Sequence, residues 1–176
     1  MVEYYTKALV LDRASRRDLD CTLTLYTKEL GRVSAKAKSL RKLTSKLSGH
    51  LTPGRLANVR IVEMGGDTKQ VVDALSMPSR TSPEFLKFLD FIRQMAPIGM
   101  PDLHLWHELE QVALKGVNDK DTYKRIISIM GYDAKNAICD NCGSVKIAYF
   151  VPRDIMFLCN RCLNDSRLKE DEVFAI

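Results

Sequence analysis

The sequence predicts an α+β protein, in which five short strands form a small β-barrel or sandwich and a small helical region with a cysteine-rich segment follows. Three observations predict this division. Apolar and polar residues alternate through much of residues 1–78, apolar residues recur at helical spacing after residue 82, and four of the five cysteines form two close pairs near the C-terminal end. We therefore expect one domain over residues 1–78 and a second over residues 79–176.

Five segments of the first domain have the pattern of half-buried strands. They are residues 4–12, 21–27, 31–38, 57–64 and 69–75. The third segment alternates Val33, Ala35 and Ala37 with Arg32, Ser34, Lys36 and Lys38, which predicts a strand whose outer face is basic. Five short strands within about 75 residues predict a barrel or a sandwich.

Helical periodicity begins after a capping signal. Ser82 is a suitable N-cap and Pro83 a suitable first helical residue. A second helix is expected over residues 102–115, and a third over about residues 121–131 with Asp119 or Asp121 as its cap. The apolar residues expected to face inward from the first helix are Phe85, Leu86, Leu89, Ile92 and Met95.

The composition is that of an ordinary globular protein, with 45% hydrophobic and 28% charged residues. No window approaches the roughly 18 uninterrupted apolar residues of a membrane span, and the N-terminal residues lack a signal-peptide layout, so we expect a cytoplasmic protein. The net charge of +5 is unevenly spread, because residues 1–100 carry 17 basic and 10 acidic residues, whereas residues 101–176 carry 10 and 12. The front half is therefore the part expected to bind an anion.

The two cysteine pairs have the spacing of a metal site. Residues 139–162 contain a C-x2-C-x16-C-x2-C array formed by Cys139, Cys142, Cys159 and Cys162. A tetrahedral Zn²⁺ takes four thiolates at about 2.3 Å, and two C-x2-C turns supply them. The residues between the pairs predict two short strands about a Pro-Arg-Asp turn, so we expect a zinc ribbon with one structural Zn²⁺ per chain. The alternatives are four free thiols or a redox pair that uses one C-x2-C. The fifth cysteine, Cys21, is expected to be a small buried hydrophobe.

One basic stretch distinguishes the first domain. Residues 30–62 contain no Asp or Glu, and the eight cations within them are Arg32, Lys36, Lys38, Arg41, Lys42, Lys46, Arg55 and Arg60. A solvated loop is the simplest explanation of a charge run, although solubility alone is served by mixed signs. Phosphate binding favours each cation through counterion release and is opposed by an interspersed carboxylate. We therefore expect nucleic acid to bind here mainly through its backbone, because Tyr4, Tyr5 and Tyr26 lie on other strands.

No catalytic group can be assembled from the sequence. His104 and His107 occur as H-x-x-H-E rather than the H-E-x-x-H of metalloproteases, and His50 stands alone. The sequence contains no Gly-rich phosphate loop ending in Gly-Lys-Ser/Thr. No Ser-His-Asp or Cys-His nucleophile arrangement can be assembled from it. We therefore expect a protein without enzymatic activity.

The order of these parts resembles the RecO family of bacterial DNA repair proteins. The stretch KALVLDRASRRDLDCTLTLYTKELGRVSAKAKSLRKLTSKLSGHLTPG is similar to the family's N-terminal region, with an A-hydrophobic-V-L strand, a D-x-x-L-T-L-x-T-x-E-x-G-R strand and turn, a basic segment and a G-x-L-x-P element. MGYDAKNAICDNCGS and FVPRDIMFLCNRC resemble the two halves of the family's zinc-binding segment. Members of the family usually extend further beyond the second cysteine pair, so the resemblance implies a short form.

The resemblance implies an N-terminal five-stranded OB-fold barrel and a helical domain that carries the zinc site. It also implies a protein that binds single- and double-stranded DNA, anneals complementary strands and supports recombinase loading. The implied partners are a RecR-like protein, the single-stranded DNA-binding protein through its acidic tail, and RecA indirectly, all in the cytoplasm at the nucleoid. The DNA face would comprise Arg32, Lys36, Lys38, Arg41, Lys42 and Lys46, with Arg16 and Arg17 as weaker candidates.

Two other classes of function remain open. A zinc-ribbon scaffold that binds RNA or a transcription or translation partner, without annealing activity, also suits a small barrel followed by a ribbon. A zinc hydrolase is disfavoured, because all four thiols would be consumed as ligands and no general base is apparent.

Overall fold

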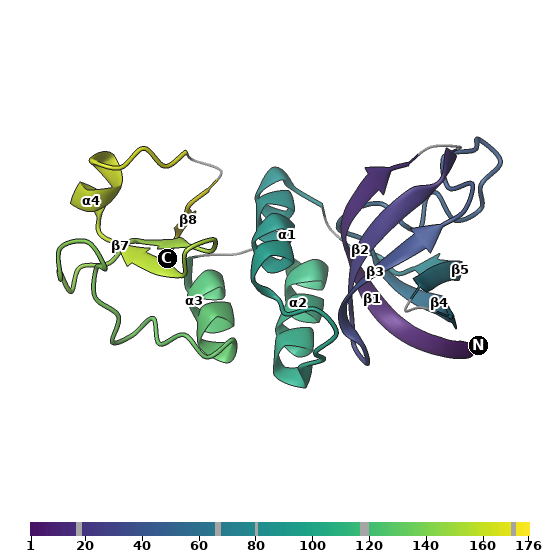
Figure 1. The fold of residues 1–176 in the computed structure, drawn as a ribbon, viewed down its shortest axis with the longest axis horizontal. Helices are drawn as coiled ribbons and strands as arrows, with labels where there is room; N and C mark the ends of the chain where they lie inside the picture. The colour runs from purple at the N-terminus through teal and green to yellow at the C-terminus, as the bar shows by residue number, and fades with distance from the viewer. Residues whose placement is uncertain (17–18, 66–67, 80, 117–119, 170–171) are drawn as a thin grey trace. The chain divides into compact units, whose positions relative to one another are not determined.

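A computed structural model describes residues 1–16, 19–65, 68–79, 81–116, 120–169 and 172–176. The chain forms two compact units, Met1–Val117 and Asn118–Ile176. The first contains five strands and two helices, and the second contains the cysteine-rich segment (Figure 1). Within the described residues, no helix is both long and apolar enough to cross a membrane.

The predicted barrel is confirmed. Its strands are β1 (Val2–Ser15), β2 (Cys21–Thr27), β3 (Gly31–Ala37), β4 (Leu56–Met64) and β5 (Thr68–Ser76). They close in the order β1-β2-β3-β5-β4, with β3 and β5 parallel and the other neighbours antiparallel. Strand β1 is longer than predicted because it pairs with both β2 and β4, and an irregularity between Val10 and Asp12 divides its pairing with β2.

The barrel interior is built from alternating residues, as the sequence predicts. In β3, Val33, Ala35 and Ala37 are buried while Ser34 and Lys36 are exposed. Cys21 is also buried in this core. The connection between β3 and β4 closes one end of the barrel, because its Leu40 and Leu51 are fully buried and Leu47 packs against the same cluster.

Two helices cover part of the outside of the barrel. Helix α1 (Pro83–Met95) begins at the predicted cap, where the Ser82 hydroxyl accepts a hydrogen bond from the Phe85 N–H. Helix α2 (Leu103–Lys115) is capped by Asp102. Both pack against β1, which explains why residues 8–11 are buried on consecutive positions rather than alternate ones. Leu86, expected inside, is exposed, and the buried positions of α1 include Phe88 and Phe91 instead.

The second unit combines one longer helix with a small sheet. Helix α3 (Lys120–Ile129) packs against β8 (Phe174–Ala175), with the rings of Tyr123 and Phe174 5.6 Å apart. The predicted hairpin is present as β6 (Tyr149–Val151) and β7 (Met156–Leu158), followed by the short helix α4 (Asn160–Asn164). Strand β8 adds to β6, so the sheet has the order β7-β6-β8.

The helical residues are divided between the two units. The sequence places all of residues 79–176 in one domain, whereas α1 and α2 belong to the same compact unit as the barrel. The last strand of the barrel, β5, ends at Ser76, two residues before the boundary expected from the sequence.

Candidate metal centre and candidate nucleic-acid interface

Four cysteine sulfurs meet in the second unit. The Sγ atoms of Cys139, Cys142, Cys159 and Cys162 all lie within 4.8 Å of one another. Cys142 is exposed and the other three are buried. All four thiols are free of disulfide bonds. The cluster could therefore hold one metal ion.

Two tight turns bring the sulfurs together. In the first, the Gly143 N–H donates to the Cys139 carbonyl at 2.8 Å, and Gly143 adopts a φ of +71° that favours glycine. In the second, Cys159 is the N-cap of α4, and its sulfur accepts a hydrogen bond from the Cys162 N–H at 3.5 Å. The Cys159 N–H in turn donates to the Cys139 sulfur at 3.4 Å, which joins the two turns.

The thiols differ in how readily they ionise. Burial, the largest single influence, works to raise the pKa of Cys139, but backbone N–H groups of Cys159, Asn141 and Cys142 lower that pKa to about 6. The neighbouring Cys142 sulfur and burial raise the pKa of Cys162 to about 12. The Cys162 thiol therefore resists ionisation at neutral pH, and a bound cation would stabilise its thiolate.

The histidines form no comparable site. His104 and His107 are exposed on α2, and the His50 ring is hydrogen-bonded to Ser76 on the barrel. Among the described residues, the four cysteines are the only group of three or more His, Cys, Asp or Glu side chains close enough to hold a metal ion.

Six cations gather at one end of the barrel, and we call them the basic surface. Its members, all exposed, are Arg16, Lys36, Lys38, Arg41, Lys42 and Lys46. Lys36 lies on the outer face of β3, where its partner on β2 is Thr22. Arg41 connects the β3–β4 loop to the residues between β1 and β2, since its guanidinium donates to the Arg16 carbonyl and its N–H to the Leu19 carbonyl. Within the part of the chain that the structure describes, none of the six forms an ion pair with a carboxylate.

The other predicted DNA contacts do not join the basic surface. Arg32 is partly covered, because the corner between α1 and α2 lies on β3 and the Gly99 N–H donates to the Arg32 carbonyl. Burial and the nearby Arg93 lower the pKa of Arg32. Arg55 is partly buried in the turn before β4. Arg17 lies outside the described residues.

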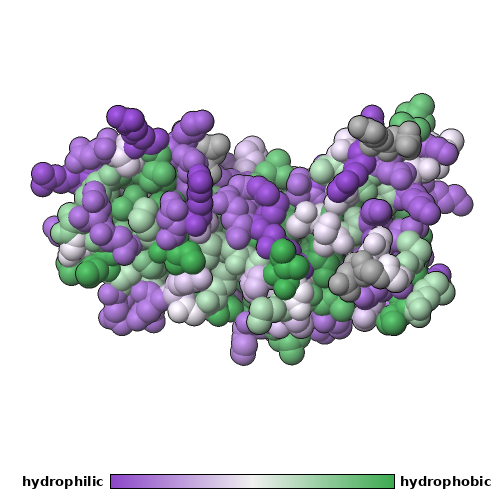
Figure 2. Space-filling model, viewed as in Figure 1, coloured by the Kyte–Doolittle hydropathy of each residue, from purple (hydrophilic) through white to green (hydrophobic). Residues whose placement is uncertain are grey.

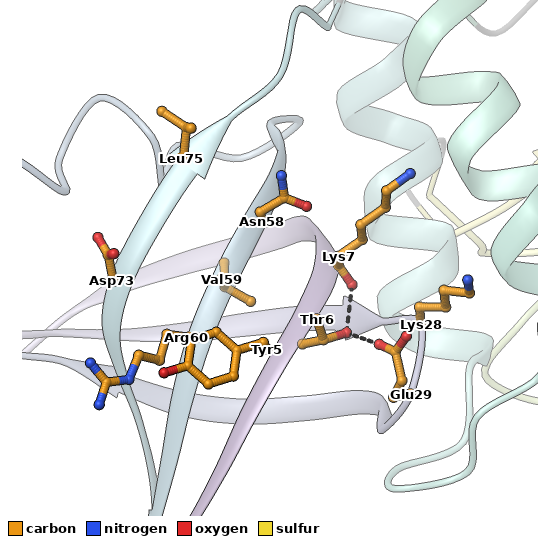
Figure 3. A pocket seen from close by; sticks show the side chains of 10 residues that line it. All are labelled: Tyr5, Thr6, Lys7, Lys28, Glu29, Asn58, Val59, Arg60, Asp73 and Leu75. Carbon is orange, nitrogen blue, oxygen red and sulfur yellow. Dashed lines mark hydrogen bonds between the residues drawn. The ribbon is translucent and has the colours of Figure 1, made fainter.

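Arg60 belongs to a separate groove on the β1–β4–β5 side of the barrel. The groove has a volume of about 430 Å³. The Arg60 side chain lies beside Tyr5 (Figure 3), with its guanidinium 5.6 Å from the centre of the Tyr5 ring. The same guanidinium lies 2.8 Å from a Glu3 carboxylate oxygen. The groove lining also contains Lys7 and Lys28, together with the carboxylates of Glu29 and Asp73. This mixture of signs is unfavourable for a polyanion.

The sequence pattern did not reveal the groove or the position of Arg60. The pairing of β1 with β4 places Tyr5 opposite Arg60, and these residues are 55 positions apart. A pairing between such distant segments leaves no signal in a local pattern. The link from Arg41 to Arg16 and Leu19 was missed for the same reason.

The comparisons with known proteins agree with this architecture. Residues 1–76, which form the barrel, match the family model described as the N-terminal domain of recombination protein O. Proteins named DNA repair protein RecO from Dehalococcoides mccartyi strains BAV1, 195 and CBDB1 are 24%, 23% and 23% identical over 181 residues. Each alignment covers 92% of this chain and 71% of the relative, so the similarity extends beyond the barrel into the cysteine-rich unit. The barrel thus resembles the N-terminal domain of the RecO family, and the chain is similar to RecO proteins over most of its length.

Proposed function

We propose that this chain binds DNA through the basic surface and promotes the annealing of complementary strands. The observation that carries the proposal is the gathering of six exposed cations at one end of the barrel, without an ion pair to a carboxylate in the described part of the chain. The basic surface spans the outer face of β3 and the β1–β2 turn. In OB-folds, the side of strands 2 and 3 and the adjoining loops bind oligonucleotides.

Annealing by such a surface requires no bond chemistry from the protein. Two DNA strands repel each other through their phosphates, and cations that contact both reduce this repulsion. The aligned bases then pair by themselves. The proposed function is therefore that of a recombination mediator rather than an enzyme. Its proposed partners, on the strength of the family, are a RecR-like protein, the single-stranded DNA-binding protein and, indirectly, RecA in the cytoplasm at the nucleoid.

We propose that the four cysteines hold one structural Zn²⁺. A tetrahedron with Zn–S bonds of about 2.3 Å has S–S edges of about 3.8 Å. The Cys142 and Cys159 sulfurs are 3.7 Å apart, which supports this assignment. With four protein ligands no coordination position remains for a substrate, so the ion would stabilise the second unit rather than act on DNA.

An annealing assay tests the main proposal. Complementary oligonucleotides, one with a fluorophore and one with a quencher, are mixed at low salt with the protein or with a Lys38→Glu, Arg41→Glu, Lys42→Glu variant. We expect the wild type to accelerate annealing and the variant to lose most of this effect. A control with equal charge change, Lys115→Glu, Lys124→Glu, Lys135→Glu, should retain it, because these exposed lysines lie outside the basic surface.

The same assay separates annealing from the scaffold alternative. If the wild type does not accelerate annealing and instead prefers structured RNA to single-stranded DNA in competition, the chain is an RNA-binding scaffold. Equal losses in the variant and the control would mean that net charge, rather than the basic surface, promotes annealing.

A further inference from the structure

The loop that carries most of the basic surface presents one leucine to solvent. Residues 38–54 contain four leucines, of which Leu40 and Leu51 are fully buried and Leu47 packs against the barrel core. Leu43 is exposed as fully as in an extended peptide, with a relative accessibility of 106%. The loop therefore has three apolar anchors and one apolar side chain that is directed away from the core.

Hydrogen bonds fix the backbone on both sides of Leu43. The Lys42 N–H donates to the Ser39 carbonyl at 3.1 Å, and the Ser45 N–H donates to the Lys42 carbonyl at 3.0 Å. The Arg41 N–H donates to the Leu19 carbonyl at 3.0 Å, which ties the loop to the β1–β2 turn. Leu43 is thus presented by consecutive turns of a hydrogen-bonded loop.

Backbone strain is concentrated at the same place. Leu19 and Ser39 have φ angles of +66° and +52°, and they are two of three non-glycine residues with positive φ in the described chain. Such conformations cost about 1 kcal/mol or more and persist where the surroundings enforce them, often at binding sites. Here the Ser39 N–H donates to an Asp20 carboxylate oxygen at 2.7 Å. Leu19 is itself 41% exposed and adds a second apolar side chain to this end of the barrel.

An isolated exposed leucine is common on proteins, and Figure 2 shows small hydrophobic patches among hydrophilic residues on the visible face. Leu43 differs in its neighbours. It follows Arg41 and Lys42 directly and lies between Lys38 and Lys46, all exposed members of the basic surface. A ligand that contacts these cations through its phosphates must also approach Leu43.

We propose that Leu43 is a base-contacting residue, which packs against unstacked bases of a DNA strand while the surrounding cations bind its phosphates. This inference rests on the proposed function. Nucleobases are the apolar component of a DNA strand, and leucine is among the side chains that proteins insert between bases. The contact gives the basic surface an apolar, salt-independent part, which holds bases outward for pairing with a second strand.

Oligonucleotides with and without bases test the proposal. We expect Leu43→Ala to bind a single-stranded oligonucleotide about tenfold more weakly than the wild type, at both low and moderate salt, because the lost apolar contact is worth about 1.4 kcal/mol. An abasic oligonucleotide of equal length keeps the phosphates and lacks the bases, so the wild type and Leu43→Ala should bind it equally. Leu75→Ala, which removes another exposed leucine on β5, is the matched control and should bind both probes like the wild type.

A spectroscopic variant gives an independent measurement. Leu43→Trp places an indole at this position, and the native Trp106 is only 1% exposed and so adds a constant background. Stacking on bases should quench the new fluorescence with the normal oligonucleotide and not with the abasic one. Equal affinity of Leu43→Ala and the wild type for the normal oligonucleotide, or an equal loss on both probes, would overturn the inference and leave DNA binding intact. Absence of wild-type binding to either probe would overturn the proposed function, and this inference with it.

Discussion

Neutralising half of the basic surface should halve the salt dependence of DNA binding. The surface has six exposed cations without carboxylate partners in the described chain, and Lys38, Arg41 and Lys42 are three of them. Each phosphate contact to a single strand contributes about 0.7 to the slope of log K against log salt. Six contacts therefore give a slope of about −4, or a loss of about 300-fold in affinity between about 50 and 200 mM salt.

The variant Lys38→Gln, Arg41→Gln, Lys42→Gln should reduce this slope to about −2, and the same increase in salt should then weaken binding by about 20-fold. Fluorescence anisotropy with a labelled single strand, measured at four or more salt concentrations, gives both slopes. Lys115→Gln, Lys124→Gln, Lys135→Gln removes the same charge from other exposed positions and controls for net charge.

Two results would contradict this reasoning. A variant slope equal to the wild-type slope would mean that these side chains do not contact phosphates. An equal reduction in the control would mean that net charge, rather than the basic surface, sets the salt dependence.

Three further predictions concern stability. Chelation of the metal, or Cys159→Ser, should unfold the second unit and leave the first folded. Hydrogen exchange measures the protection of the backbone amides in each unit separately. Amides of the second unit that stay protected after the metal is removed would refute a structural role for the ion. Gly31→Ala should lower the free energy of unfolding by about 1–3 kcal/mol in urea titrations, because Gly31 has a φ of +64° and an added Cβ would lie 2.4 Å from the Met100 carbonyl oxygen. Burial raises the pKa of Tyr26 to about 12. In the unfolded chain this tyrosine ionises near its ordinary pKa of about 10, so raising the pH favours the unfolded state. The free energy of unfolding should therefore fall by about 2–3 kcal/mol between pH 10 and 12. Tyr26→Phe should remove that part of the pH dependence.

The sequence predicts those features that depend on neighbours along the chain. The alternation of Val33, Ala35 and Ala37 is enough to place β3, and the two C-x2-C turns are enough to predict a metal cluster. It does not predict the burial of Tyr26, because Asp102, which lies near its hydroxyl, is 76 residues away along the chain. Strand β8 was missed as well, because two residues carry no periodicity and its position is set by pairing with β6.

The absence of acidic residues from a segment is informative only where sequence neighbours remain neighbours in space. In the β3–β4 loop this condition is met, since Lys38 to Lys46 lie on consecutive turns and the joining β1–β2 turn adds Arg16. In β4 it fails, because strand pairing places the carboxylates of Glu3 and Asp73 beside Arg60. The eight cations of the basic stretch therefore divide into an exposed part without ion pairs in the described residues and a part that is neutralised or covered. Only the first part should attract a DNA strand, and Leu43 lies within it.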